Sequence, residues 1–452
     1  MTSETIDSTK SLHLPSGCDS VPTRWKWSRL DEICNGVFDC PHSTPKLAEA
    51  GPFVVRTQDI ITGVFRSEQA AHVSEETYDE RTSRALPTRG DLLYSREGTY
   101  FGIAAEVPER TQVCLGQRMV LIRPKPDTVD FRFLRHWLNS PIMASHIHGY
   151  RDGSVAERLN LPTIRALPVL IPSIAEQRAI AHILCSLDDK IELNRRMNET
   201  LEGLARAIFQ SWFVDFDPVR AKRDSLAQSH LAPATADFFP DRFEDSIIGL
   251  IPKGWEIRSL AEIMDIQGGT QPPASEFLSE PCEGYIRLVQ IRDYETDSHL
   301  TFIPDTSKLR KCRRDDVMIA RYGASVARVC WGLDGAYNVA LVKAAPTMQC
   351  YREFLRSYLQ APDFQTRLIG MSNRSVQAGF NKGDIASFKI ACPPDALFAA
   401  YQEVAWSLRH LVLQNRDQSR AVAAVRDALL PKLLSGEIRV VEAAGIVEDA
   451  IK

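Results

Sequence analysis

The stretch VPTRWKWSRLDEIC at residues 21–34 returns as IPKGWEIRSLAEIM at residues 251–264. The two stretches share the pairs Pro22/Pro252, Trp25/Trp255, Leu30/Leu260, Glu32/Glu262 and Ile33/Ile263. A fixed pattern that recurs at this distance indicates an internal duplication. If the duplication is overlooked, the whole fold is assigned wrongly.

The duplication continues along both copies. RGDLLYSREG at residues 89–98 is echoed by RDDVMIARYG at 314–323, and FLRHWLNSP at 133–141 by FLRSYLQAP at 354–362. We therefore interpret the chain as two copies of one unit of roughly 220 residues, with small insertions early in each copy.

Each copy consists of two parts with different sequence patterns. Its first part mixes short β-type runs such as DLLYS and MVLIRP with Gly, Pro and Asp, which predicts a strand-rich domain with a few helices. Its second part is helical, because residues 174–213 contain no proline and one glycine. The fold class that we predict is α+β, with two mixed strand-rich domains in a pseudo-twofold repeat, separated by two long helices.

The two helices carry a narrow apolar seam with alternating spacings of three and four residues, which predicts an antiparallel coiled coil. Pro431 is expected to stop or kink the second helix. Asn194 and Asn415 occupy matching seam positions, either as buried amides that fix the register or as solvated side chains at the seam edge. The seam residues are Leu187, Asn194, Met197, Leu201, Leu204, Ile208, Leu408, Asn415, Val422, Val425 and Leu429.

The same textures give the domain boundaries that we expect. They are a disordered N-terminal arm at 1–20, a first domain at 21–172, a central helical spacer at 173–216, a connector at 217–250, a second domain at 251–393, a distal helical spacer at 394–436 and a C-terminal tail at 437–452.

Composition indicates a cytoplasmic protein. The 452 residues contain no apolar run of membrane-spanning length, and the polar N-terminus is unlike a secretory signal. The ten cysteines form no CxxC pair, which favours reduced thiols. The net charge of −4 argues against nucleic-acid binding unless Lys and Arg are concentrated locally.

Catalytic signatures are absent from the sequence. It contains no GxxxxGK[ST], GxGxxG, HExxH or GxSxG motif, and no Asn or Asp followed by Pro, Pro and an aromatic residue. His146 and His148 form a close pair without an acidic or Cys partner nearby, so we expect no metal site there. We predict no catalytic residue and no cofactor bound by this chain.

Local basic clusters do occur, at residues 308–328 and 118–135. We pair Arg56 with Arg287 and Arg96 with Arg321, because each pair follows similar apolar runs in the two copies; Arg can contact guanine or phosphate from such positions. Two later loops, YRDGSVAERLN and MSNRSVQAGFN, also hold polar side chains suited to bases, or to ordinary turns and caps. The DNA-contact candidates are Arg56, Gln58, Arg96, Arg118, Arg151, Ser154, Asn160, Arg287, Gln290, Arg321, Arg374, Ser375, Gln377 and Asn381.

Three stretches resemble the specificity subunits of Type I restriction-modification systems. They are residues 247–263, 176–222 and 408–438, which follow the family's order of recognition domain, central helix, recognition domain and distal helix. One departure stands out: Glu176 and Gln177 fit the family pattern, but the second copy has Leu397 and Phe398, so we expect the distal helix to begin or dock differently.

The resemblance implies a non-catalytic protein whose two domains each read half of a split target on double-stranded DNA. It further implies that the helices set the spacing and bind two methyltransferase subunits, which restriction motor-nuclease subunits join. S-adenosylmethionine, ATP and magnesium then belong to the partners, and no membrane is involved. Two other readings are an orphan DNA-binding module without a restriction partner and a structural coiled-coil scaffold.

Overall fold

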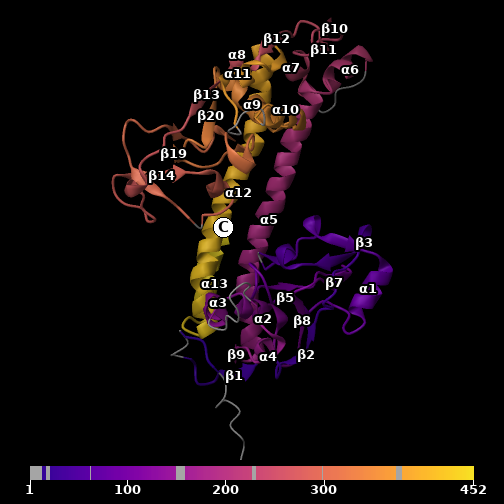
Figure 1. The fold of residues 1–452 in the computed structure, drawn as a ribbon, viewed down its shortest axis with the longest axis vertical. Helices are drawn as coiled ribbons and strands as arrows, with labels where there is room; N and C mark the ends of the chain where they lie inside the picture. The colour runs from indigo at the N-terminus through magenta and orange to yellow at the C-terminus, as the bar shows by residue number, and fades with distance from the viewer. Residues whose placement is uncertain are drawn as a thin grey trace, which may run out of the picture. The chain divides into compact units, whose positions relative to one another are not determined.

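The computed structural model describes residues 13–16, 21–61, 63–148, 158–225, 231–297, 299–372 and 379–451 (Figure 1). The chain divides into unit 1, residues 1–194 and 417–452, and unit 2, residues 195–416. None of the helices in the described ranges has the length and apolarity needed to cross a membrane. Most of the expected N-terminal arm, residues 1–12 and 17–20, lies outside the described residues.

Unit 1 is built on three small sheets. The strand orders are β2-β8-β5-β6, β4-β3-β7 and β1-β9. The strands are β1 (Lys26–Arg29), β2 (Cys34–Asp39), β3 (Leu47–Val55), β4 (Ala71–Val73), β5 (Leu92–Ser95), β6 (Ala104–Glu106), β7 (Val113–Leu115), β8 (Met119–Pro124) and β9 (Pro168–Ile171). The shorter helices are η2 (Thr57–Ile60), η3 (Ser67–Gln69), α1 (Glu75–Thr82), α2 (Phe131–Leu138), α3 (Pro141–His148), α4 (Leu161–Arg165) and α13 (Val440–Ile451).

Strand β5 shows why this region is strand-forming. All four of its residues are buried, and alternate side chains enter different clusters, with Leu92 and Tyr94 on one side and Leu93 on the other. A strand covered on both faces requires a continuous apolar run. The LLY run therefore defines the centre of the four-stranded sheet.

Unit 2 repeats this topology. Its four-stranded sheet β13-β20-β17-β18 corresponds to β2-β8-β5-β6, β12-β21 corresponds to β1-β9, and β15-β14-β19-β16 extends the third sheet by one strand. The strands are β10 (Phe243–Ser246), β11 (Gly249–Pro252), β12 (Glu256–Ser259), β13 (Met264–Gly268), β14 (Tyr285–Val289), β15 (Phe302–Pro304), β16 (Lys311–Cys312), β17 (Val317–Ala320), β18 (Val329–Cys330), β19 (Gly335–Tyr337), β20 (Leu341–Pro346) and β21 (Lys389–Cys392). The helices are α6 (Asp217–Arg223), α7 (Pro233–Ala236), α8 (Leu260–Ile263), η4 (Ala274–Glu276), η5 (Ile291–Tyr294), η6 (Gly323–Ser325), η7 (Gln349–Tyr351), α9 (Arg352–Gln360), α10 (Pro362–Ser372) and α11 (Lys382–Ala386).

Two long helices contribute to both units: α5 (Ile174–Phe213) and α12 (Asp395–Ser435). Their pairing is antiparallel within each unit. In unit 1 the buried Asn194 donates to Gln418 Oε1 at 3.0 Å, and in unit 2 Asn415 donates to Asn198 Oδ1 at 2.9 Å. The predicted α+β class with a long helical pair is confirmed.

The seam prediction is wrong at two positions. Met197 and Leu204 are 43% and 49% exposed, whereas Asn198 is half-buried and Ala205 is buried. The second seam position of α5 therefore lies one residue later than predicted. The sequence pattern selected the larger apolar side chains, but the helix interface takes the small or amide residue beside them.

The remaining predictions for the helices are resolved as follows. Pro431 does not stop α12, which continues to Ser435. The distal helix begins at the equivalent place in its copy, since Ile174 and Asp395 both follow the last strand of their domain. It docks differently, because Gln177 donates to Pro172 O at 3.0 Å while Phe398 packs edge-to-face against Tyr351 and Phe354.

Both linking segments contain regular structure in the part of the chain that the structure describes. Residues 217–250 contain α6, α7 and the hairpin β10–β11, and Val219 and Phe239 are buried in the main core of unit 2. At the C-terminus, α13 buries Ala443 and Val447 in the main core of unit 1.

Candidate DNA interface

The first pair of candidates caps a short helix in each unit. Arg56 precedes η2 and Gln290 precedes η5, and their backbone N–H groups donate to Asp59 at 2.8 Å and Asp293 at 3.0 Å. Arg56 is thus equivalent to Gln290, and its proposed match with Arg287 is wrong. The sequence match was misleading because unit 2 has four more residues than unit 1 between the Ile33/Ile263 pair and this turn.

The polar groups of these residues form hydrogen bonds or ion pairs within the fold. The Arg56 guanidinium donates twice to Asp59, at 3.1 Å each, and Gln290 Nε2 donates to Thr301 Oγ1 at 3.2 Å. Arg287 pairs with Asp297 at 2.8 Å. Gln58, by contrast, is exposed.

Arg96 and Arg321 are equivalent, as predicted from RGDLLYSREG and RDDVMIARYG. Their backbone N–H groups donate to Arg118 O and Ala340 O, at the same step of the four-stranded sheet. Arg96 binds both carboxylate oxygens of Asp39, at 2.8 and 2.9 Å. Arg321 donates to Phe380 O at 3.1 Å, and its guanidinium lies 5.0 Å from the Tyr322 ring centre.

The turns after Arg96 and Arg321 lie beside the later candidate loops. An isolated β-bridge joins Glu97 to Arg158 in unit 1, and another joins Tyr322 to Gly379 in unit 2. Two regions far apart in the sequence therefore meet in each unit. Five candidates between these bridges and the preceding helices fall outside the described residues: Arg151, Ser154, Arg374, Ser375 and Gln377.

Exposed cations flank the turn of unit 1. Arg118 is 57% exposed, has a φ of 69° and lies 3.4 Å from Glu97, while Arg158 is also exposed. We call Arg118, Arg158 and the turn between β5 and β6 the turn face of unit 1.

Asn160 and Asn381 are helix caps. Asn160 Oδ1 accepts from Thr163 N at 2.8 Å, and Asn381 Oδ1 accepts from Gly383 N at 2.7 Å. The Asp384 carboxylate accepts from Asn381 N at 2.8 Å and completes a capping box. The repeated asparagines are therefore explained by helix initiation.

The basic clusters separate into buried and exposed parts. Arg123 and Arg135 are held by carboxylates, and Lys311 and Arg328 pair with Asp305 and Glu295. Lys308, Arg310 and Arg313 are exposed at or beside β16, an outer strand of its sheet. We call these three residues the basic edge of unit 2. The charge run in the sequence indicated these residues, but it did not show which cations form side-chain ion pairs.

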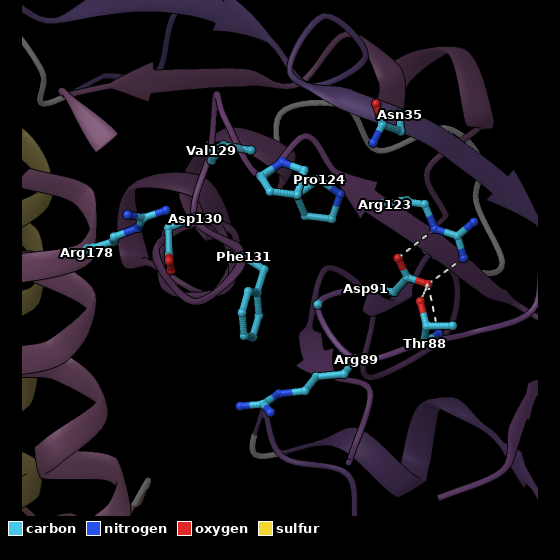
Figure 2. Close-up of a pocket in the computed structure, with 12 residues that line it drawn as sticks. Asn35, Thr88, Arg89, Asp91, Arg123, Pro124, Val129, Asp130, Phe131 and Arg178 are labelled. Carbon is cyan, nitrogen blue, oxygen red and sulfur yellow. Dashed lines mark hydrogen bonds and ion pairs between the residues drawn. The ribbon is translucent and has the colours of Figure 1, made fainter. Parts of the chain in front are cut away.

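A pocket of unit 1 lies between the ends of β5 and β8 and the start of α2 (Figure 2). Arg123 holds Asp91 there with two hydrogen bonds, at 2.7 and 2.8 Å, and Thr88 N donates to the same carboxylate at 3.0 Å. Asp130 caps α2. Both lining carboxylates are thus engaged, and Phe131, Arg178 and Arg89 also line the pocket, with Arg89 3.3 Å from Glu109 (Figure 2).

Cys185 and His136 approach each other to 3.5 Å but do not form a reactive pair. Burial, helped by Arg135, lowers the pKa of His136 to about 3 and burial raises the pKa of Cys185 to about 11. A neutral thiol beside a neutral imidazole is a poor nucleophile. His, Cys, Asp and Glu side chains in the described ranges form no group of three that could hold a metal ion.

Comparisons with known proteins agree on one family. Residues 22–203 match the model of the Type I restriction modification DNA specificity domain. The MjaIX specificity subunit of Methanocaldococcus jannaschii is 24% identical over 390 residues, which cover 84% of each chain. The HindI specificity subunit of Haemophilus influenzae is also 24% identical, over 85% of this chain and 94% of that one. Residues 22–203 thus match the Type I restriction modification DNA specificity domain, and the chain as a whole is similar to specificity subunits of Type I restriction enzymes.

The fold of this chain is similar to that of a solved S subunit. The S subunit from M. genitalium superposes with a TM-score of 0.56 at 15% identity, covering 93% of this chain and 99% of that one. The family model that matches residues 22–203 describes a DNA specificity domain. The resemblance inferred from residues 176–222, 247–263 and 408–438 is confirmed.

Proposed function

We propose that this specificity subunit selects a two-part DNA target, one half read by residues 21–172 and the other by residues 251–393. The observation that carries the proposal is the repeated topology, since one chain builds the same sheet order twice. A protein with two equivalent reading domains suits two half-sites held at a fixed separation.

In unit 1, Arg118 and Arg158 on the turn face make phosphate contacts, and in unit 2 Lys308, Arg310 and Arg313 on the basic edge do so. These side chains are exposed, and no described carboxylate lies closer to Arg118 than the 3.4 Å contact with Glu97. Phosphate contacts position a protein on the duplex, whereas contacts to base edges give sequence specificity. The loops that hold Arg151 and Arg374 supply base contacts.

The helical spacers at 173–216 and 394–436 set the distance between half-sites and dock two methyltransferase subunits. Apolar side chains on both helices support this assignment: Leu193 of unit 1 is exposed, as are Met197, Leu204, Val404 and Leu411 of unit 2. Restriction subunits join this core. S-adenosylmethionine, ATP and magnesium serve the partner subunits, and the methyltransferases flip the target adenines.

A domain exchange tests the proposal. Residues 21–172 are replaced by the corresponding domain of another specificity subunit, the chain is expressed with its methyltransferase, and methylated sites are mapped by sequencing. We expect one half of the methylated target to change while the other half and the spacer remain. A change in both halves contradicts the proposal. Equal, salt-sensitive binding of the unmodified chain to random and cognate duplexes would favour the scaffold reading instead.

A further inference from the structure

The two units share one topology but differ in the charges found where each strand-rich domain meets its long helix. Three positions define this junction in each unit: the end of a sheet strand, the arginine of the FLR motif, and one residue of the long helix. In unit 1 they are Glu106, Arg135 and Asp188. In unit 2 the strand and sequence registers place Trp331, Arg356 and Arg409 at the same points.

The unit 1 junction holds its arginine between two carboxylates. Arg135 is buried, with Nε 3.0 Å from Glu106 Oε1 and Nη2 3.1 Å from Asp188 Oδ2. The other oxygen of Asp188 accepts from Arg426 Nη1 at 3.0 Å. The long helix therefore contributes the negative charge that the domain's arginine requires.

The unit 2 junction reverses the contribution of the helix. Arg409 of α12 lies 2.8 Å from Glu353 Oε2, and this carboxylate comes from the domain's own helix α9. Arg356 is fully buried, 3.2 Å from the same oxygen, and its guanidinium lies 4.4 Å from the Trp331 ring centre. Here the long helix supplies a positive charge, and the domain supplies the acid.

The sequence alignment of the two copies identifies the residues that differ in charge. The residue of unit 1 that corresponds to Glu353 is Arg132, and the residue that corresponds to Arg409 is Asp188. The ion pair between domain and long helix is Arg135 with Asp188 in unit 1 and Glu353 with Arg409 in unit 2, so the charge on the helix residue is reversed. Exchanging only the domains would bring Glu353 against Asp188, or Arg132 and Arg135 against Arg409.

We propose that each strand-rich domain is matched to its own long helix by this buried charge pattern, so that the two domains are not interchangeable unless the helix residue changes with them. Breaking one partner of a buried ion pair leaves an uncompensated charge, and like charges in such a site are worse. The surface of each helix at 188 or 409 is therefore a docking site for a domain of stated charge. The proposal concerns assembly of the fold and does not depend on DNA recognition.

Charge exchange in unit 2 tests the proposal in the full-length chain. Arg409→Asp places a carboxylate beside Glu353, and we expect the urea midpoint of unfolding to fall markedly. The double variant Glu353→Arg with Arg409→Asp exchanges the two charges, so that domain and helix again carry opposite signs as in unit 1, and should recover more than half of that loss. Glu403→Arg, a charge reversal at an exposed site of the same helix, should leave the midpoint almost unchanged.

If Arg409→Asp yields no folded chain, the double variant decides alone. A folded double variant supports the proposal, and an unfolded one overturns it. A graft provides a second measurement: residues 251–393 are replaced by a copy of residues 21–172, with Arg409 retained or changed to Asp. We expect cooperative unfolding of the second domain only with Asp. Equal stability of the two grafts contradicts the proposal, whatever their DNA binding.

Discussion

Trp25 donates its indole N–H to Glu176 at 3.1 Å, whereas the equivalent Trp255 has a buried indole nitrogen with no hydrogen-bond partner among the described residues. The difference comes from the first turn of each long helix. Glu176 lies in the first turn of α5, but Leu397 takes the equivalent place in α12 and is buried in the apolar core. The two copies thus keep the tryptophan and differ in what satisfies it.

Replacing Glu176 with leucine should reproduce the unit 2 arrangement in unit 1. The change leaves the Trp25 N–H buried without an acceptor and removes the 2.8 Å contact with Arg24. We expect a loss of about 1–3 kcal/mol in the free energy of unfolding, measured with urea. Glu176→Gln keeps an acceptor and should lose much less. Equal losses for both variants would show that the acceptor is unimportant.

The fold could be predicted from the sequence more fully than the positions of individual side chains. The duplication, the strand-rich domains and the long helices follow from periodic patterns that a sequence carries directly. The match of Arg56 with Arg287 failed because an insertion moved the capping turn, which only backbone geometry places. The seam prediction was wrong at Met197 and Leu204 because the size of an apolar side chain does not decide which side of a helix faces its neighbour.

Asn160 and Asn381 are DNA-contact candidates that cap helices in the structure. Substituting them therefore distinguishes a structural role from a role in DNA recognition. Asn160→Ala and Asn381→Ala remove an acceptor for the first N–H groups of α4 and α11, so each should cost about 0.5–2 kcal/mol of stability. Asn→Ser substitutions at the same positions retain a capping oxygen and should cost little. Measured DNA affinity of the folded variants should stay within the range of the unmodified chain. A large loss of affinity in the Ser variants would instead assign base contacts to these asparagines.

Acid should weaken the unit 1 junction. Burial acts to raise the pKa of Asp188, but Arg135, His136 and Arg426 outweigh it, and the pKa lies below its ordinary value of 3.8. A carboxyl with a lower pKa in the folded chain stabilises the fold above its unfolded pKa, and this contribution disappears as the pH falls through the folded pKa.

Asp188→Asn should therefore flatten the loss of stability as the pH falls below about 5 and through the lowered pKa of Asp188, as followed by urea unfolding. The matched control is Asp189→Asn, because Asp189 is the exposed neighbour on the same helix. The control should keep the pH dependence of the unmodified chain. If both variants give the same profile, the titration of Asp188 does not contribute.

The basic edge of unit 2 predicts a specific salt dependence. Replacing Lys308, Arg310 and Arg313 with alanine should weaken binding to cognate and random duplexes alike and lower the slope of log K against log salt by about 1 for each phosphate that the protein no longer neutralises. A gel-shift series over salt concentration measures this slope. Lys253→Ala with Lys389→Ala removes exposed cations elsewhere in unit 2 and should leave it unchanged. An unaltered slope in the triple variant would assign these cations to protecting the outer strand β16 from pairing with other chains.

The exposed apolar side chains of α5 predict where a methyltransferase binds. Met197 and Leu204 lie outside the helix seam, so an aspartate there disturbs no core contact but adds a charge to any protein interface formed over them. Met197→Asp with Leu204→Asp should abolish or strongly reduce co-purification with the methyltransferase subunits, because desolvating unpaired charges is costly. The urea midpoint of the isolated chain should change little. Arg206→Asp, at an exposed polar site of the same helix, tests whether added negative charge alone is responsible. Full retention of the methyltransferase by the double variant would place the docking surface on another face of the helices.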